Sequence, residues 1–194
     1  MRKTACFIFL SFLVSGCAYI SQNLKVEPSA NILSSQVGAG KKIGLCVVDE
    51  REDRIIGNRS NVYGMKTAKI TTDQDVPEIL QTAMSDGLRK KGFLPVAKDE
   101  SATSMKVELR VLAYDVEMGF WTGGNIGKST IKIVATNAAG QTYEKMYHGQ
   151  REIRTCFLGS QETNAKVVNC AFSAAIENIF NDKDLIDFLV KEEK

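Results

Sequence analysis

The sequence has a single histidine, and this scarcity excludes several kinds of catalytic and metal site. A Ser-His-Asp or Cys-His site would have to use His148, which lies in a polar stretch without a serine or cysteine nucleophile motif beside it. One histidine and scattered cysteines also cannot form a zinc site with the usual ligand spacing. We therefore interpret His148 as a half-exposed strand residue, and we expect a protein without enzymatic activity, metal or cofactor.

The mature chain is also expected to have no net charge. Arg2 and Lys3 lie in a leader-like N-terminus, and without them the 25 basic side chains become 23, equal to the 23 acidic ones. A neutral chain has no electrostatic reason to bind nucleic acid, so we expect no nucleic-acid partner. No stretch after residue 17 resembles a membrane span.

The N-terminus has the order of a secretory signal. A positive start is followed by an apolar run over residues 5–14 and by two small residues before Cys17. The run is too short to span a bilayer as a helix, which takes roughly 20 apolar residues. Its ending, Val-Ser-Gly-Cys at 14–17, resembles a bacterial lipobox, which implies cleavage before Cys17 and a diacylglycerol on its thiol.

These features divide the chain into three parts. Residues 1–16 are expected to be a signal peptide that is removed, residues 17–40 the lipidated Cys17 and a flexible tether, and residues 41–194 a single periplasmic domain. The tether is rich in Ser, Asn and Gly and has no sustained period, although one short edge strand around residues 24–26 is an alternative. Ala18 follows Cys17, whereas an Asp there retains enterobacterial lipoproteins in the inner membrane. We therefore expect a lipid anchor in the outer membrane, on its periplasmic face.

Three cysteines remain after the signal and the lipidated thiol are set aside. Cys156 and Cys170 would close a short loop and are the better pair for a disulfide in an oxidising compartment. Cys46 lies in an apolar run and is interpreted as a buried free thiol. Sequence cannot fix the connectivity, so two unpaired thiols are the alternative.

The apolar pattern predicts an α+β domain. In the strand 104–118 the apolar positions change from odd to even at Leu112, which indicates a bulge. The clearest helix begins after Asp75, an N-cap with Glu78 three residues on. Consecutive strands joined by short turns indicate an antiparallel sheet with helices packed on one face. Strands are expected at 42–49, 66–72, 93–96, 104–118, 129–136 and 142–154, and helices at 76–91, 160–180 and 183–190.

A glycine-rich stretch interrupts the strands. Residues 122–129 nearly match the phosphate-loop pattern, with Thr122 in place of the first glycine, but a strand pattern follows where nucleotide binding needs a helix. We therefore interpret residues 119–128 as a turn and expect no nucleotide partner. Phe120 and Trp121 are either core residues or an interaction surface, because aromatic side chains are favoured at interfaces.

Six consecutive charged residues at 49–54 offer paired carboxylates. Acid–base catalysis needs two carboxylates in different environments of one pocket, and a calcium loop needs a different spacing. A solvated loop with local ion pairs is the favoured interpretation. The alternative is a structural pair of Asp49 and Arg51, whose side chains leave an extended segment on the same side.

Five features spread along the chain resemble those of one bacterial family. They are the lipobox at Cys17, a first strand that runs into Asp49-x-Arg51, the helix end Lys91-Gly92-Phe93, the strand end Tyr114-Asp115-Val116, and the Asn-Ala-Ala-Gly-Gln turn at 137–141. Together they resemble the YajG-like family of bacterial envelope lipoproteins over about residues 40–190. The resemblance implies an envelope lipoprotein with a small periplasmic α+β domain, and it implies no reaction.

A looser likeness to small lipoprotein subunits of envelope transport and secretion machines is architectural. We expect a non-enzymatic binding or accessory component of such an assembly, docked to an envelope protein through its sheet edge or loop ends. The alternative is a module that binds a small ligand, lipid or peptidoglycan in a groove between helix 76–91 and the sheet.

Overall fold

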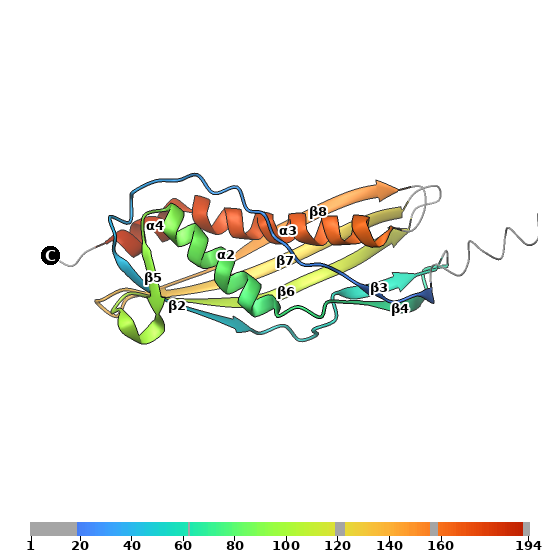
Figure 1. The fold of residues 1–194 in the computed structure, drawn as a ribbon, viewed down its shortest axis with the longest axis horizontal. Helices are drawn as coiled ribbons and strands as arrows, with labels where there is room; N and C mark the ends of the chain where they lie inside the picture. The colour runs from blue at the N-terminus through green and yellow to red at the C-terminus, as the bar shows by residue number, and fades with distance from the viewer. Residues whose placement is uncertain (1–18, 62, 119–122, 156–158, 192–194) are drawn as a thin grey trace, which may run out of the picture.

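The computed structural model describes residues 19–61, 63–118, 123–155 and 159–191. Within them, eight strands form one sheet, and the helices pack on one face of it (Figure 1). The predicted α+β class is confirmed. The elements in chain order are β1 (Gln22–Asn23), β2 (Lys42–Asp49), β3 (Gly57–Ser60), β4 (Lys66–Thr71), α2 (Val76–Lys90), β5 (Leu94–Ala97), the short 3-10 helix η2 (Lys98–Glu100), β6 (Ser104–Met118), β7 (Gly123–Thr136), β8 (Thr142–Thr155), α3 (Gln161–Asn181) and α4 (Lys183–Val190).

The sheet was predicted to be antiparallel, but it is mixed, with the long strand β6 at its centre. On one side β6 pairs with antiparallel β7, which pairs in turn with antiparallel β8. These three strands are the meander that the sequence predicts. On its other side β6 pairs with two parallel strands, β2 along its first half and β3 near its second. The strands β2 and β5 are also parallel, because the chain crosses over through α2 between them.

Local signals placed α2 and the bulge correctly. The Asp75 side chain accepts a hydrogen bond from the Glu78 amide at 3.1 Å, as an N-cap does. The register of β6 on β7 shifts between Leu109 and Val111, which is the predicted bulge. After the shift, Leu112 and Tyr114 continue to face the core. One extra residue therefore keeps a 15-residue strand buried on a single face.

The core lies between the two long helices and the sheet. Helix α2 packs on β2 and β5, and α3 packs on β7 and β8. The inward side of α2 is filled by Val76, Leu80, Met84 and Leu88, all of them buried. These side chains occupy the space in which the sequence suggested a ligand groove.

Residues 19–40 are part of the folded domain, which corrects the described part of the flexible tether predicted for residues 17–40. Figure 1 shows this segment, in blue, crossing over α3. Leu24 and Val26 alternate with exposed residues and are buried in the core. Among the described residues, β1 is the first strand of the sheet, and it lies close to the short edge strand that was the alternative.

Polar side chains of α3 hold this segment in place. The backbone amides of Glu27, Ser29 and Asn31 donate to Asn169 Oδ1 at 2.8 Å, Ser173 Oγ at 2.8 Å and Glu177 Oε1 at 2.6 Å. Asn169 also donates from Nδ2 to the Lys25 carbonyl at 2.9 Å. Residues four apart on the helix match amides two apart on an extended segment, since both spacings are about 6 to 7 Å.

Replacing Asn169 tests this attachment. Asn169→Ala removes one acceptor and one donor to the N-terminal segment, and we expect the free energy of unfolding to fall by about 1 kcal/mol. Urea unfolding followed by circular dichroism measures the change, and hydrogen exchange of residues 24–32 should accelerate. Lys166→Ala, at an exposed position of the same helix, is the matched control. Equal stability of the two variants would contradict this attachment.

Two glycines let α3 approach the sheet closely. A Cβ on Gly127 would lie 2.1 Å from the Val167 carbonyl oxygen, and one on Gly149 would lie 1.9 Å from that of Ala171. Gly127 belongs to a stretch that was predicted to be a turn, but residues 123–128 are the beginning of β7. For residues 123–128 that interpretation was wrong, because Gly127 serves helix packing on a strand rather than chain reversal.

Candidate functional site

The strand β8 forms an open edge of the sheet. It pairs with β7 from Thr142 to Thr155, and no other strand of the described residues pairs with it. The His148 carbonyl accepts a hydrogen bond from Asn178 Nδ2 at 2.9 Å, from the side opposite β7. In an antiparallel strand the N–H and C=O of one residue point to the same side, and the side alternates along the strand. The even-numbered residues from 144 to 154 therefore direct their backbone groups toward the open edge.

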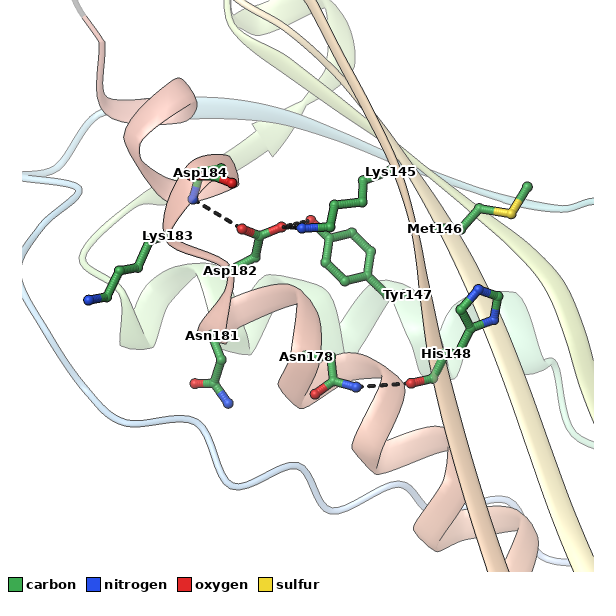
Figure 2. A pocket seen from close by; sticks show the side chains of 9 residues that line it. All are labelled: Lys145, Met146, Tyr147, His148, Asn178, Asn181, Asp182, Lys183 and Asp184. Atoms are coloured by element: carbon green, nitrogen blue, oxygen red, sulfur yellow. Dashed lines mark hydrogen bonds and ion pairs between the residues drawn. The ribbon is translucent and has the colours of Figure 1, made fainter.

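A hollow of about 620 Å³ lies against this edge (Figure 2). One wall is β8 over residues 145–148, and the other is the junction of α3 and α4 with Asn178 and residues 181–184. Met146 and His148 adjoin the hollow on the strand side, but Figure 2 shows their side chains pointing away from the helix junction, and Met146 is 53% exposed. The hollow thus combines backbone groups of an open strand with the side chains of Lys145, Tyr147 and the helix junction.

Asp182 connects the α3–α4 junction to β8. Its Oδ2 accepts hydrogen bonds from Lys145 Nζ at 2.7 Å, Tyr147 OH at 2.6 Å and Tyr143 OH at 2.9 Å. Its Oδ1 accepts one from the Asp184 amide at 3.0 Å, as the N-cap of α4. Figure 2 shows Asp182 reaching across the hollow toward Lys145 and Tyr147. Asp182 therefore ends α3 with its backbone amide, and its carboxylate begins α4 and holds the junction against the edge strand.

The protonation states in this cluster are fixed across the neutral range. Burial opposes ionisation of Asp182, but the hydrogen bonds from Lys145 and the two tyrosines outweigh it and lower its pKa to about 2. Burial raises the pKa of Tyr147 and of Tyr143, and the adjoining Asp182 carboxylate raises them further. The hydrogen bond to Asp182 raises the pKa of Lys145. General acid–base catalysis at pH 7 needs a group that exchanges its proton near that pH, so this cluster is suited to holding structure.

The sequence missed this cluster, although part of its signal was visible. Tyr143, Lys145 and Tyr147 alternate along β8 and therefore share a face, and Asp182 directly precedes the predicted helix 183–190. What the sequence does not contain is the contact between strand and helix junction. That contact depends on how α3 packs on β7 and β8, whose glycines allow the helix to approach closely.

The acidic and basic cluster at residues 49–54 resolves into two parts. Asp49 and Arg51 form a two-pronged ion pair, with Nε to Oδ1 and Nη2 to Oδ2 both at 2.8 Å, and only 10% and 5% of their side chains are exposed. The hydrogen bond from Arg51 lowers the pKa of Asp49 despite its burial. The alternative of a structural pair is thus confirmed for these two residues, while Glu50, Glu52 and Asp53 are exposed.

His148 lies on β8 and is exposed, with its Nδ1 3.0 Å from Thr130 Oγ1 on β7. Within the described part of the chain, no group of three or more His, Cys, Asp or Glu side chains could hold a metal ion. No described helix is long and apolar enough to cross a membrane.

Several predicted site residues lie outside the described residues. Cys17, Phe120, Trp121 and Cys156 are among them, so lipidation of Cys17 and an interaction surface at Phe120 and Trp121 stay predictions. Cys170 is half-buried on α3, and its pairing with Cys156 also stays a prediction.

Three solved structures align with most of this chain and share little sequence with it. A homolog of neuraminyllactose-binding hemagglutinin from Helicobacter pylori aligns with a TM-score of 0.51 at 10% identity, covering 87% of this chain and 96% of its own. A protein from Xanthomonas campestris aligns with a TM-score of 0.49 at 12% identity, covering 88% and 94%. A minor lipoprotein from Acinetobacter baumannii has a TM-score of 0.43 at 9% identity, covering 78% and 94%. At 10% identity the first likeness shows a shared fold alone.

The comparison with curated proteins found no match. A family model described as an uncharacterized lipoprotein matches residues 28–190, which is most of the chain. This match agrees with the resemblance carried by the sequence features between Asp49 and residue 141. The chain therefore belongs to the Lipoprotein_16 family, the YajG-like lipoproteins of bacteria.

Proposed function

We propose that this lipoprotein is anchored in the outer membrane by a lipid on Cys17 and binds an envelope protein on the periplasmic side. In this account it is a non-enzymatic accessory component of an envelope assembly such as a secretion or transport machine. Its membership of a lipoprotein family supports the anchor, and Ala18 next to Cys17 supports the outer membrane. The partner contributes an extended segment that pairs with β8.

The observation that carries this proposal is the open edge of β8 with a hollow beside it. An added strand forms main-chain hydrogen bonds with an exposed sheet edge, and its alternate side chains enter adjoining pockets, which gives specificity. β8 offers both an exposed edge and an adjoining pocket. Its even-numbered residues direct their backbone groups toward the open edge, and the hollow adjoins residues 145–148. The His148 carbonyl already accepts a hydrogen bond from Asn178. The backbone N–H and C=O groups on either side of His148 are therefore the ones that a partner strand would pair with.

The chemistry of the same region favours binding over catalysis. Asp182 stays ionised and its two tyrosine partners stay protonated at neutral pH, since their pKa values are displaced away from that range. These groups hold the helix junction and the strand in a fixed relation. A rigid edge lowers the entropic cost of docking an extended segment.

Introducing a proline into β8 should impair docking of a partner strand without impairing folding. Gln150→Pro removes an amide that points away from β7, so the fold should survive, as edge strands tolerate proline at such positions. We expect the variant to retain its unfolding free energy to within about 1 kcal/mol but to lose co-purification of envelope proteins with the tagged full-length protein from membranes. Gln150→Ala is the control, because it keeps the amide and should keep the partner. Equal capture by the proline variant would contradict docking at β8.

A further inference from the structure

The hairpin of β3 and β4 ends in an exposed apolar tip. Tyr63 is 83% exposed and Met65 is 59% exposed. The tip is a tight turn, in which Asn61 Oδ1 accepts from the amides of Tyr63 and Met65, both at 3.0 Å. The turn is completed by Gly64, whose positive φ of 78° favours glycine. Two large apolar side chains are thus displayed to solvent by a fixed turn rather than by a loose loop.

The beginning of the described chain, residues 19–23, lies at the same end of the molecule as this tip. The strand β1 pairs with β4 in parallel, with Gln22 opposite Ile70, so the chain before Gln22 runs back toward the turn. Figure 1 shows β3, β4 and the beginning of the described chain at the end opposite the C-terminus. Tyr19 and Ile20, exposed by 62% and 63%, add apolar surface on this side.

The distance from Gln22 to Cys17 sets how far the anchor can be from the tip. Five residues span at most about 18 Å when fully extended. On the neighbouring strand, Met65 precedes Ile70 by five residues as well and lies about 16 Å along β4. A lipid on Cys17 therefore cannot extend far beyond the level of Tyr63 and Met65, so the bilayer surface lies within reach of the tip.

The charge of the hairpin suits an anionic surface. Residues 57–71 contain the cations Arg59, Lys66 and Lys69 and no acidic side chain, and both lysines are exposed. On the neighbouring strand, Glu117 is exposed and Asp115 pairs with Lys128. Tyrosine is favoured at the level of lipid headgroups, and cations close to the membrane are attracted to anionic lipids.

We propose that the β3–β4 tip inserts its Tyr63 and Met65 side chains into the headgroup region of the membrane and fixes the orientation of the domain. This proposal rests on the lipid anchor at Cys17 proposed above. The tip and the anchor form two attachments at one end. The long axis of the domain then points away from the bilayer, with the α3–α4 junction and α2 held on the far side.

Two methionines of similar exposure provide the test. Met65 at the tip and Met146 on β8 are 59% and 53% exposed, so they should oxidise equally in water. The full-length lipidated protein is placed in vesicles of phosphatidylethanolamine and phosphatidylglycerol, and each methionine is quantified by mass spectrometry after brief hydroxyl-radical exposure. We expect oxidation of Met65 to be at least about fivefold lower than that of Met146, and the double variant Lys66→Glu/Lys69→Glu to reduce this difference.

The possible outcomes distinguish failure of tip insertion from failure of the lipid anchor. If the protein floats with the vesicles but both methionines oxidise equally, the tip is in water and the proposal is wrong, while the anchor stands. If the protein does not float, the anchor at Cys17 is wrong and the proposal is overturned with it. Protection of Met65 that grows with the protein-to-lipid ratio would assign the tip to a second copy of the chain and would also overturn it.

Discussion

Gly149→Val is expected to lower the free energy of unfolding by about 3 kcal/mol or more. A Cβ at this position would lie 1.9 Å from the Ala171 carbonyl oxygen and 2.7 Å from the Ala175 amide nitrogen, both in the backbone of α3. A helix backbone cannot move aside as a flexible side chain can, so α3 would have to lift from β8. Because α3 covers β7 and β8 and carries much of the core, the whole domain should respond.

Gln150→Val is the matched control for this substitution. It introduces the same side chain one position along β8, where the residue is exposed and points to the opposite face. Valine also suits a strand, so its effect on stability should lie within about 0.5 kcal/mol of zero. Urea unfolding of both variants measures the contrast. If the Gly149→Val protein were as stable as the control, packing of α3 on β8 would not require a residue without a Cβ at this position.

Asp182→Ala is expected to cost about 3 kcal/mol, since it removes the acceptor of three side-chain hydrogen bonds and the N-cap of α4. Only 8% of the Asp182 side chain is exposed, and Tyr147 is also buried, so its hydroxyl would lose its partner away from water. Asp187→Ala, at an exposed position of α4, controls for the loss of an acidic residue. Similar stability of the two variants would contradict the role given to Asp182.

The charge of Asp182 also predicts a dependence on pH. Its folded pKa of about 2 lies below the unfolded value near 3.9. The stabilisation is therefore fully present above about pH 5 and is lost as the pH falls from about 4 to 2. Asp182→Asn keeps the shape and removes the titration. The stability difference between wild type and this variant should shrink by about 2 kcal/mol between pH 6 and pH 2, and a difference that does not change with pH would contradict a lowered pKa of Asp182 in the folded protein.

Local sequence signals were enough for the elements that depend on neighbours in the chain. The cap of Asp75 and Glu78 set the beginning of α2, and the change of apolar positions at Leu112 located the bulge in β6. Both features arise from residues within one or two turns or strand periods. The meander of β6, β7 and β8 was predictable for the same reason, because its connections are short.

The contacts between distant parts of the chain could not be predicted in this way. The bond from the Glu27 amide to Asn169 joins residues 142 positions apart, and a segment rich in Ser and Asn was therefore mistaken for a tether. The parallel pairing of β2 with β5 and β6 has no local signal either. The hollow at β8 depends on the same long-range arrangement, since α3 must first be seated over Gly127 and Gly149 before Asp182 can reach the tyrosines of β8.

Photo-crosslinking in living cells tests the docking of a partner at β8 most directly. A photoreactive amino acid replaces Met146, which is 53% exposed on the edge strand β8, or Val111, which is 36% exposed on the central strand β6 away from the edge. The proposal predicts a defined adduct with an envelope protein from position 146, none from position 111, and loss of the adduct when Gln150→Pro is added. No adduct from position 146, or the same adduct from both positions, would contradict the docking of a partner along β8.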